Sequence, residues 1–436
     1  MDYRVNVIGC GLAGAEATYQ LSKRGISVDV YEMKPTKFSP AHTSSDFAEV
    51  VCSNSFKSED IATASGCLKA EMNIFGSIIL DCAREVKVPA GTALAVDREL
   101  FSKLVTEKIN ALNNVTVHRE EVTKIDLSVP TIIATGPLTS DALSSEICSL
   151  IGSENLHFYD ASAPIIDSET LDKSKIFTAG RYGKGESDYI NCPMNKEEYY
   201  AFINELVNAE RVELHSFEKS EIFDGCMPVE VMASRGEDTL RFGPLRPVGL
   251  RLDDGTKPYA VVQLRKESNT SSLYNIVGFQ TNLKFGEQKR VFSMIPALKD
   301  ADFVKYGVMH RNSYICAPKH LNADFSVKGY DNLYIAGQLS GVEGYMESTA
   351  SGMLAGIFLA NKLLGKSLDY LPKTTIMGAI CSYLITASSD NFQPMNANFG
   401  ILPELDEKIK DKSLRKQAYS NRAIEDLKKY KEKFEC

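Results

Sequence analysis

The chain has 436 residues, of which 44% are hydrophobic, and its formal net charge is −8. This length is enough for two or three domains with a large core. The absence of an 18-residue apolar run argues against a membrane span, and the acidic balance does not favour nucleic-acid binding by the chain as a whole. The 10 cysteines show no C-x-x-C spacing, which predicts reduced thiols in the cytoplasm and argues against a zinc ribbon or a dithiol-disulfide reductase motif. No metal site is expected.

The N-terminal segment carries a dinucleotide-binding pattern. An apolar strand at 5–8 runs into Gly9-Cys10-Gly11-Leu12-Ala13-Gly14, an amphipathic helix follows, and a second strand at 28–32 ends in Glu32. In a βαβ unit, Gly9 permits the tight turn, Gly11 lets the backbone approach a pyrophosphate, and Gly14 lets the helix pack closely. The helix N-terminus offers free N–H groups to the phosphates. Glu32 would accept hydrogen bonds from a ribose diol, which favours FAD or NAD over NADP. A glycine-rich turn without a ligand is the alternative.

Two later strands are predicted to complete this cofactor site. Residues 131–137 form a buried strand with a small-residue turn, and residues 331–338 form another, followed by a glycine-rich turn at 341–345. The next helix is rich in small residues, and its N-terminus would direct a positive dipole at a ligand. The spacing from the N-terminal glycines favours FAD over NAD, although an ordinary strand–turn–helix has the same pattern. The cofactor-binding residues predicted here are Gly136, Gly337, Gln338, Gly341, Glu343, Gly344 and Tyr345.

The middle of the chain reads as an insertion into this cofactor domain. Alternating residues at 259–265 and 276–280 predict antiparallel strands, and residues 195–207 predict a helix. We therefore expect an α/β fold in which residues 1–136 and 331–436 form a Rossmann-type, glutathione-reductase-like FAD-binding domain. Residues 137–330 are expected to form an inserted α+β domain for the substrate or RNA.

The C-terminal tail, from about Leu405, is predicted to be a charged helix. From Lys408 onward it has 10 Lys and Arg residues against 5 Asp and Glu residues. This pattern fits either a solvated helix face or a basic face for RNA.

Longer blocks of sequence point to one family. The blocks are AHTS at 41–44, VCSNS at 51–55, VPAG at 88–91, LAVDR at 94–98, YINCPMN at 189–195, GCMPVE at 225–230, TLRFGP at 239–244, GVMHRN at 307–312 and FQPMN at 392–396. Together with 341–345 they resemble the TrmFO family of folate- and FAD-dependent tRNA (uracil-5-)-methyltransferases, from about residue 3 to about residue 403. The departures are small: Phe56-Lys57 replaces a Leu-Arg pair, Ser234 replaces an acid, and Thr92 replaces a glycine.

The resemblance implies a reaction and its partners. FAD, reduced by NADH or NADPH, takes a one-carbon unit from methylenetetrahydrofolate and delivers it to uracil C5 in RNA, and the flavin supplies the reducing equivalents for the methyl group. The expected product is 5-methyluridine in the tRNA T-loop. A uridine of 23S ribosomal RNA is the alternative, because RNA choice depends on shape and surface charge. The expected enzyme is cytoplasmic and needs no membrane or stable protein partner.

Two cysteines are implied as the catalytic pair. Uracil C5 is a poor nucleophile until a group adds to C6, and a thiolate does this well. We expect Cys226 to be this nucleophile, in a loop shaped by glycine and proline. Cys52 is expected to be the partner thiol that removes the C5 proton or gates the flavin intermediate. A buried structural cysteine is the alternative for both, and it is the role predicted for Cys10, Cys67, Cys82, Cys148, Cys316 and Cys381.

The remaining site residues are expected to contact the flavin, the folate or the RNA. Tyr345 is expected to stack near the isoalloxazine ring. Basic side chains suit the folate glutamate tail and RNA phosphates, and the candidates are Arg98, Arg241, Lys284, Lys289, Arg290, His310 and Arg311. Two other functions stay open: an FAD-dependent oxidoreductase acting on a small metabolite, and a flavin-containing RNA-binding factor without catalysis. Dependence of product formation on RNA separates the first from a methyltransferase.

Overall fold

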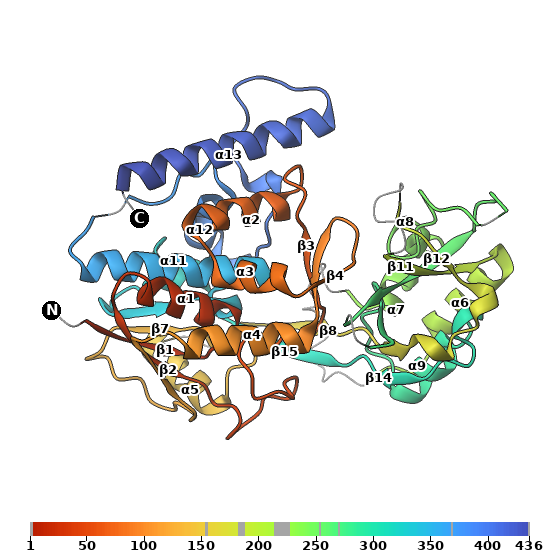
Figure 1. Ribbon diagram of the computed structural model, residues 1–436, viewed down its shortest axis with the longest axis horizontal. Helices are drawn as coiled ribbons and strands as arrows, with labels where there is room; N and C mark the ends of the chain where they lie inside the picture. The colour runs from red at the N-terminus through yellow and green to blue at the C-terminus, as the bar shows by residue number, and fades with distance from the viewer. Residues whose placement is uncertain are drawn as a thin grey trace.

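Two lobes make up the molecule in the computed structural model (Figure 1). The structure describes residues 3–152, 156–181, 188–212, 227–252, 254–268, 271–367 and 369–434, without the side chains of 156–160, 310, 311 and 391. The larger lobe holds both ends of the chain, and the smaller lobe is built from residues 165–305. No helix of the described residues is long and apolar enough to cross a bilayer.

A parallel sheet forms the centre of the larger lobe. Its strands lie in the order β16 (Leu333–Ile335), β7 (Thr131–Ile133), β1 (Arg4–Ile8), β2 (Ser27–Tyr31) and β6 (Val115–His118). Parallel strands buried on both faces are typically continuous apolar runs, and all three residues of β7 and of β16 are buried. The strands therefore bring segments from both ends of the chain into one sheet.

Two helices pack closely beside this sheet. They are α1 (Leu12–Ser22) and α11 (Tyr345–Leu363). Glycines of α11 permit the contact, because a Cβ at Gly352 would lie 2.1 Å from the Ala13 carbonyl oxygen and one at Gly356 would lie 2.9 Å from that of Ala17. The small residues of α11 thus let it approach the backbone of α1.

The other helices of the larger lobe begin at polar caps. Thr63, Ser77, Asp97 and Ser140 accept hydrogen bonds from backbone N–H groups at the starts of α2 (Ala64–Phe75), α3 (Ile78–Glu85), α4 (Arg98–Asn110) and α5 (Asp141–Ile151), which stabilises helix ends. Further elements are α10 (Ala317–His320), α12 (Ile376–Thr386), α13 (Lys412–Phe434) and a small antiparallel sheet of β3 (Ser55–Ser58), β5 (Ala93–Val96) and β4 (Lys87–Val88).

The C-terminal helix α13 lies along α2 at the edge of the larger lobe (Figure 1). It begins at Lys412, later than the sequence predicted, and it buries Ser420, Ala423, Leu427 and Tyr430. The Ser420 hydroxyl donates to the carbonyl oxygen of Ile61. The helix is therefore a packed part of the larger lobe.

The smaller lobe has an antiparallel sheet and its own hydrophobic core. The strand order is β10 (Phe177–Thr178), β11 (Tyr189–Met194), β12 (Ala260–Lys266), β13 (Leu273–Ile276), β9 (Ile165–Asp167) and β14 (Phe303–Lys305). Its helices are α6 (Lys196–Asn208), α7 (Val229–Ser234), α8 (Thr239–Phe242) and α9 (Phe285–Phe292).

The sequence predictions for this lobe are largely met, with one error. The helix predicted at 195–207 is α6, with Asn195 as its cap, and the strand predicted at 259–265 is β12. The strand predicted at 276–280 is wrong, because β13 ends at Ile276. The backbone turns at Gly278, where φ is +78° and a Cβ would lie 2.5 Å from the Cβ of Pro244.

A two-stranded antiparallel ribbon connects the lobes. It consists of β8 (Leu156–Ala161) and β15 (Met309–Tyr314), which lie between the lobes in Figure 1. Leu143 and Ile147 of α5, and Phe325 after α10, belong to the core of the larger lobe. The segment with a core of its own is thus narrower than 137–330, and the predicted domain boundaries stay a prediction.

Candidate functional site

A cavity lies at the carboxyl ends of the parallel strands. Its empty volume is about 1300 Å³, with the open mouth included. Ligands of open α/β sheets bind at this edge. Of the residues predicted from the sequence, those lining the cavity are Gly9, Cys10, Gly11, Leu12, Ala13, Glu32, Cys52, Gly136, Gly337, Gln338 and Tyr345.

The glycine motif forms one wall of the cavity, and its glycines have different surroundings. Gly9 has φ +89°, and a Cβ there would lie 2.7 Å from Thr135 Cα. A Cβ on Gly14 would lie 1.8 Å from the Gly9 carbonyl oxygen, whereas one on Gly11 would meet nothing within 4 Å. Open space at Gly11, directly before the N-terminus of α1, fits a pyrophosphate held by backbone N–H groups and the helix dipole.

Glu32 lies at the end of β2, where a ribose would bind. Its side chain is buried, and its two carboxylate oxygens accept hydrogen bonds from the backbone N–H groups of Cys10 and Lys34, each at 3.0 Å. These bonds fix the carboxylate beside the glycine motif. This wall therefore fits the adenosine half of a dinucleotide.

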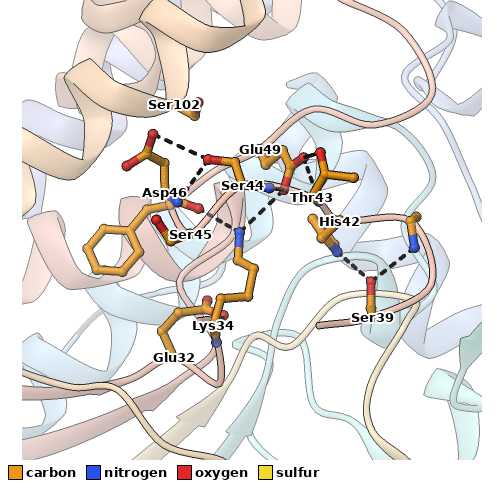
Figure 2. Close-up of polar contacts among 12 residues, drawn as sticks. Glu32, Lys34, Ser39, His42, Thr43, Ser44, Ser45, Asp46, Glu49 and Ser102 are labelled. Carbon is orange, nitrogen blue, oxygen red and sulfur yellow. Dashed lines mark hydrogen bonds and ion pairs between the residues drawn. The ribbon is translucent and has the colours of Figure 1, made fainter. Parts of the chain in front are cut away.

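A polar loop borders the same side of the cavity. Figure 2 shows Lys34 Nζ between Asp46 and Glu49: it donates to the Asp46 carbonyl oxygen at 2.5 Å and lies 3.6 Å from Glu49 Oε2. The Glu49 carboxylate also accepts from the backbone N–H groups of Thr43 and Ser44. These contacts close residues 34–49 into a fixed loop.

Four residues of this loop line the cavity without having been predicted as site residues: Lys34, His42, Ala48 and Glu49. Burial, and then the charge of Lys34, lower the pKa of His42, and its Nδ1 lies 2.6 Å from the Ser39 hydroxyl. The signal in the sequence is the block at 41–44, which contributed to the resemblance.

Cys52 lies at the cavity wall against Tyr345. The Cys52 sulfur is 2.9 Å from the Tyr345 hydroxyl oxygen, which also accepts from the backbone N–H groups of Cys52 at 3.0 Å and Ser53 at 3.3 Å. The Tyr345 ring meets Phe56 edge to face, with centroids 5.7 Å apart. Burial raises the pKa of Tyr345 well above its ordinary value, so its hydroxyl keeps its proton.

Two arginines, the buried Arg265 and the half-buried Arg98, hold the loop that carries Cys52. Arg98, at the start of α4, donates to the carbonyl oxygens of Val50 at 2.9 Å and Val51 at 3.0 Å, and it pairs with Glu267 of the smaller lobe. Arg265, on β12, donates to the side chains of Asn54 at 2.8 Å and Ser53 at 2.9 Å. The Cys52 loop therefore lies where the two lobes meet.

The sequence predicted Arg98 but not Arg265 or Glu267. A signal is present, because Gln263 and Arg265 of β12 are polar on either side of the apolar Leu264, and Glu267 continues the alternation just past the end of the strand. Such alternation places polar side chains on one face. What that face meets is not visible in the local sequence.

Four predicted cofactor residues are outside the cavity lining. Gly14 lies against Gly9, and a Cβ on Gly341 would lie 2.5 Å from the Phe392 ring. A Cβ on Gly344 would lie 2.3 Å from the Glu347 carboxylate, and Glu343 accepts from Gln338 Nε2 at 2.5 Å. These residues therefore shape the turns that place Gln338 and Tyr345.

The predicted basic residues are not gathered in one place. Arg98 is at the Cys52 loop, whereas Lys284, Lys289 and Arg290 lie on or beside α9 in the smaller lobe. Lys284 and Arg290 are in ion pairs, with Glu210 at 2.7 Å and Glu205 at 2.5 Å.

The other basic residues lie in the smaller lobe or on the ribbon. Arg241 stacks on Tyr259, with its guanidinium carbon 3.6 Å from the ring centroid. His310 and Arg311 are on β15, with side chains outside the described residues.

The cysteines fall into distinct classes. Cys226 lies outside the described residues. Cys10, Cys67, Cys82, Cys316 and Cys381 are buried and Cys148 is half-buried. Burial raises the pKa of Cys82 to about 11 and that of Cys381 to about 12, so these groups stay protonated thiols at neutral pH.

Known proteins resemble the chain over nearly its whole length. A family model described as glucose inhibited division protein A matches residues 4–367. A protein of Lactobacillus johnsonii named methylenetetrahydrofolate–tRNA-(uracil-5-)-methyltransferase TrmFO is 53% identical over 433 residues, 99% of each chain. Its namesake in Acetivibrio thermocellus is 54% identical over 435 residues, 100% of each chain.

The chain also resembles a solved structure. GidA of Aquifex aeolicus, in its form II crystal, matches with a TM-score of 0.70 at 16% identity, covering 98% of this chain and 73% of that one. At this identity the match shows a shared fold. The Rossmann-type α/β class predicted from the sequence is confirmed.

Proposed function

The chain belongs to the TrmFO family, and from this premise we propose that it forms 5-methyluridine in the T-loop of tRNA, with methylenetetrahydrofolate as the carbon donor and FAD as the cofactor. The observation that carries the proposal is the thiol of Cys52 in the wall of a cavity shaped for a dinucleotide. The relatives' names add the folate, the tRNA and the uracil C5 position. NADH or NADPH is the proposed reductant, and the proposed location is the cytoplasm.

The cavity residues fit FAD in two places. The glycine motif and the N-terminus of α1 would hold the pyrophosphate at the open space beside Gly11, and Glu32 would hold the ribose. Cys52 and Tyr345 line another part of the same cavity, together with Gln338 after β16. When bound there, FAD supplies the one-carbon and reducing chemistry.

The chain's own residues supply the nucleophile and the base. A uracil ring needs a nucleophile at C6 to become reactive at C5, and it must then lose the C5 proton. We assign the first role to Cys226, on its place in the GCMPVE block, and the second to Cys52. Cys82 and Cys381 are unsuited to either role, because burial raises their pKa values.

The proposal is tested by supplying purified FAD-loaded protein with methylene-labelled methylenetetrahydrofolate, NADH and an unmodified tRNA transcript. The expected result is label in 5-methyluridine of the tRNA, because a reduced flavin and a folate carbon are then both available. A ribosomal RNA fragment is the parallel substrate. Label in ribosomal RNA alone would keep the chemistry and contradict the tRNA assignment. No label in either RNA, with the flavin reducible by NADH, would leave the oxidoreductase and binding-factor functions.

Replacing either catalytic cysteine is expected to separate flavin binding from methylation. Cys226→Ala and Cys52→Ala should each lower the methylation rate by at least about a hundredfold, since nucleophile and base steps contribute on this scale. The flavin absorbance should be retained in Cys226→Ala. Cys148→Ala, a half-buried cysteine away from the cavity, is the matched control and should keep full activity. Full activity in Cys226→Ala would remove that residue from the mechanism.

A further inference from the structure

We propose that Tyr345 is a positioning residue for Cys52: its hydroxyl donates a hydrogen bond to the Cys52 sulfur and, together with the guanidinium groups of Arg98 and Arg265, holds that sulfur as a thiolate at the cavity wall. This inference rests on the proposed function, in which Cys52 accepts a proton. The role requires a deprotonated sulfur before the substrate arrives. The thiol proton is released to solvent.

The direction of the hydrogen bond follows from counting donors and acceptors. A tyrosine hydroxyl has one hydrogen to donate and two lone pairs that accept. Both acceptor positions of Tyr345 are taken by the backbone N–H groups of Cys52 at 3.0 Å and Ser53 at 3.3 Å. The remaining contact, 2.9 Å to the Cys52 sulfur, therefore takes the hydroxyl hydrogen. A hydrogen bond donated to sulfur stabilises the thiolate more than the thiol.

The charges around the sulfur favour the same form. Among the described residues, the titratable and charged groups that act on Cys52 include Tyr345 from α11, Arg98 from α4 and Arg265 from β12, with Glu267 paired to Arg98. Lys305 lies within electrostatic range of Arg98, Glu49 and Glu267. Two guanidinium groups against one nearby carboxylate leave positive charge beside the sulfur. Positive charge lowers the pKa of a cysteine.

The geometry also assigns which of the two groups ionises. Burial raises the pKa of Tyr345 well above its ordinary value, whereas an unperturbed thiol loses its proton near pH 8.5. The pair therefore reaches its anionic form by ionisation of the thiol, with the phenol as donor.

The test measures how the reactivity of Cys52 depends on pH in the FAD-loaded protein. Iodoacetamide alkylates thiolates, and mass spectrometry of the Cys52 peptide gives its rate at each pH from 5 to 10. Tyr345→Phe removes the hydroxyl and keeps the ring that contacts Phe56. The midpoint of alkylation is expected to rise by about one pH unit, which makes Cys52 about tenfold less reactive at pH 7. The low-pH limb of the methylation profile should move with it.

Matched variants keep the result decisive. Tyr383→Phe removes a hydroxyl that donates to the Gln393 carbonyl oxygen at 2.7 Å, and it should leave the Cys52 midpoint unchanged. An unchanged midpoint in Tyr345→Phe, with the flavin still bound, overturns the proposal. If Tyr345→Phe no longer binds flavin, Arg265→Gln is the deciding variant. A raised alkylation midpoint of Cys52 in Arg265→Gln supports stabilisation of the thiolate by nearby positive charge. An unchanged midpoint overturns the proposal.

The alkylation readout stands apart from the proposed function, because it needs neither RNA nor folate. A midpoint shift in a protein that methylates no RNA would support the inference and contradict the function. Cys52-dependent methylation with no shift in Tyr345→Phe would support the function and overturn the inference.

Discussion

Gly9, Gly11 and Gly14 are identical residues with three separate local tasks. Gly9 adopts a positive φ of +89°, Gly14 lets α1 approach the Gly9 carbonyl oxygen, and Gly11 faces open space. Their spacing was sufficient to predict all three tasks from the sequence, because the motif is read along one short βαβ segment. The partners of Cys52 were not predictable in the same way, since Arg265 lies more than 200 residues away and binds through side chains.

The second and third glycines of the motif, Gly11 and Gly14, are expected to respond differently to a methyl group. Gly14→Ala should lower the free energy of unfolding of the cofactor-free protein by about 1–3 kcal/mol, as overpacking does, because the Cβ would lie 1.8 Å from an oxygen. Gly11→Ala should leave that free energy unchanged and weaken FAD binding by about tenfold or more, since its methyl enters the pyrophosphate space. Urea unfolding and FAD titration measure both. Equal destabilisation by the two variants would contradict these assignments.

At the scale of elements, α2 and α12 are joined by a buried carboxyl group. Glu71 of α2 accepts hydrogen bonds from the backbone N–H groups of Ile376 at 2.6 Å and Met377 at 2.8 Å, at the start of α12. These N–H groups lack partners within their own helix. Burial nevertheless raises the pKa of Glu71 to about 7. The sequence does not reveal this contact, because it joins residues about 300 positions apart.

Stability is expected to fall with rising pH because of Glu71. The folded state holds the carboxyl proton between pH 4.5 and about 7, where the unfolded chain has lost it, so the free energy of unfolding decreases across that window. Glu71→Gln should remove about 3 kcal/mol of this decrease. Urea unfolding at pH 5 and pH 8 measures it, and Glu107→Gln, at an exposed glutamate, is the control. Equal decreases in wild type and Glu71→Gln would contradict the assignment.

Basic residues of the C-terminal helix α13 have structural partners that a count of charges does not reveal. Several of its basic residues have structural partners: Lys433 pairs with Asp369 at 2.8 Å, Lys431 donates to the Ile74 carbonyl oxygen at 2.5 Å and Arg422 donates to that of Pro403 at 2.6 Å. Part of the excess positive charge counted in this segment therefore serves to attach α13 to the larger lobe. An RNA-binding face on this helix stays a prediction.

For the whole molecule, the sequence predicted the cofactor lobe better than the junction between lobes. Parallel strands and the glycine motif leave local patterns, so β1 and β2 were predictable to within one residue at each end and the helix between them was expected. The junction depends on pairs such as Arg98 with Glu267, and on Asn54, which donates to the carbonyl oxygen of Lys266 at 3.0 Å. Such contacts join surfaces that become neighbours when both lobes have folded.

The cavity walls come from opposite ends of the chain, and this orders events during synthesis on the ribosome. Gly9 and Glu32 emerge early, whereas Gln338 and Tyr345 follow the entire smaller lobe. At bacterial elongation speeds the delay is on the order of tens of seconds. Throughout that time the nascent sheet lacks β16, the neighbour of β7, and α1 lacks its partner α11. We therefore expect the cofactor to bind late in synthesis. All walls of the cavity are present only in chains that extend past Tyr345.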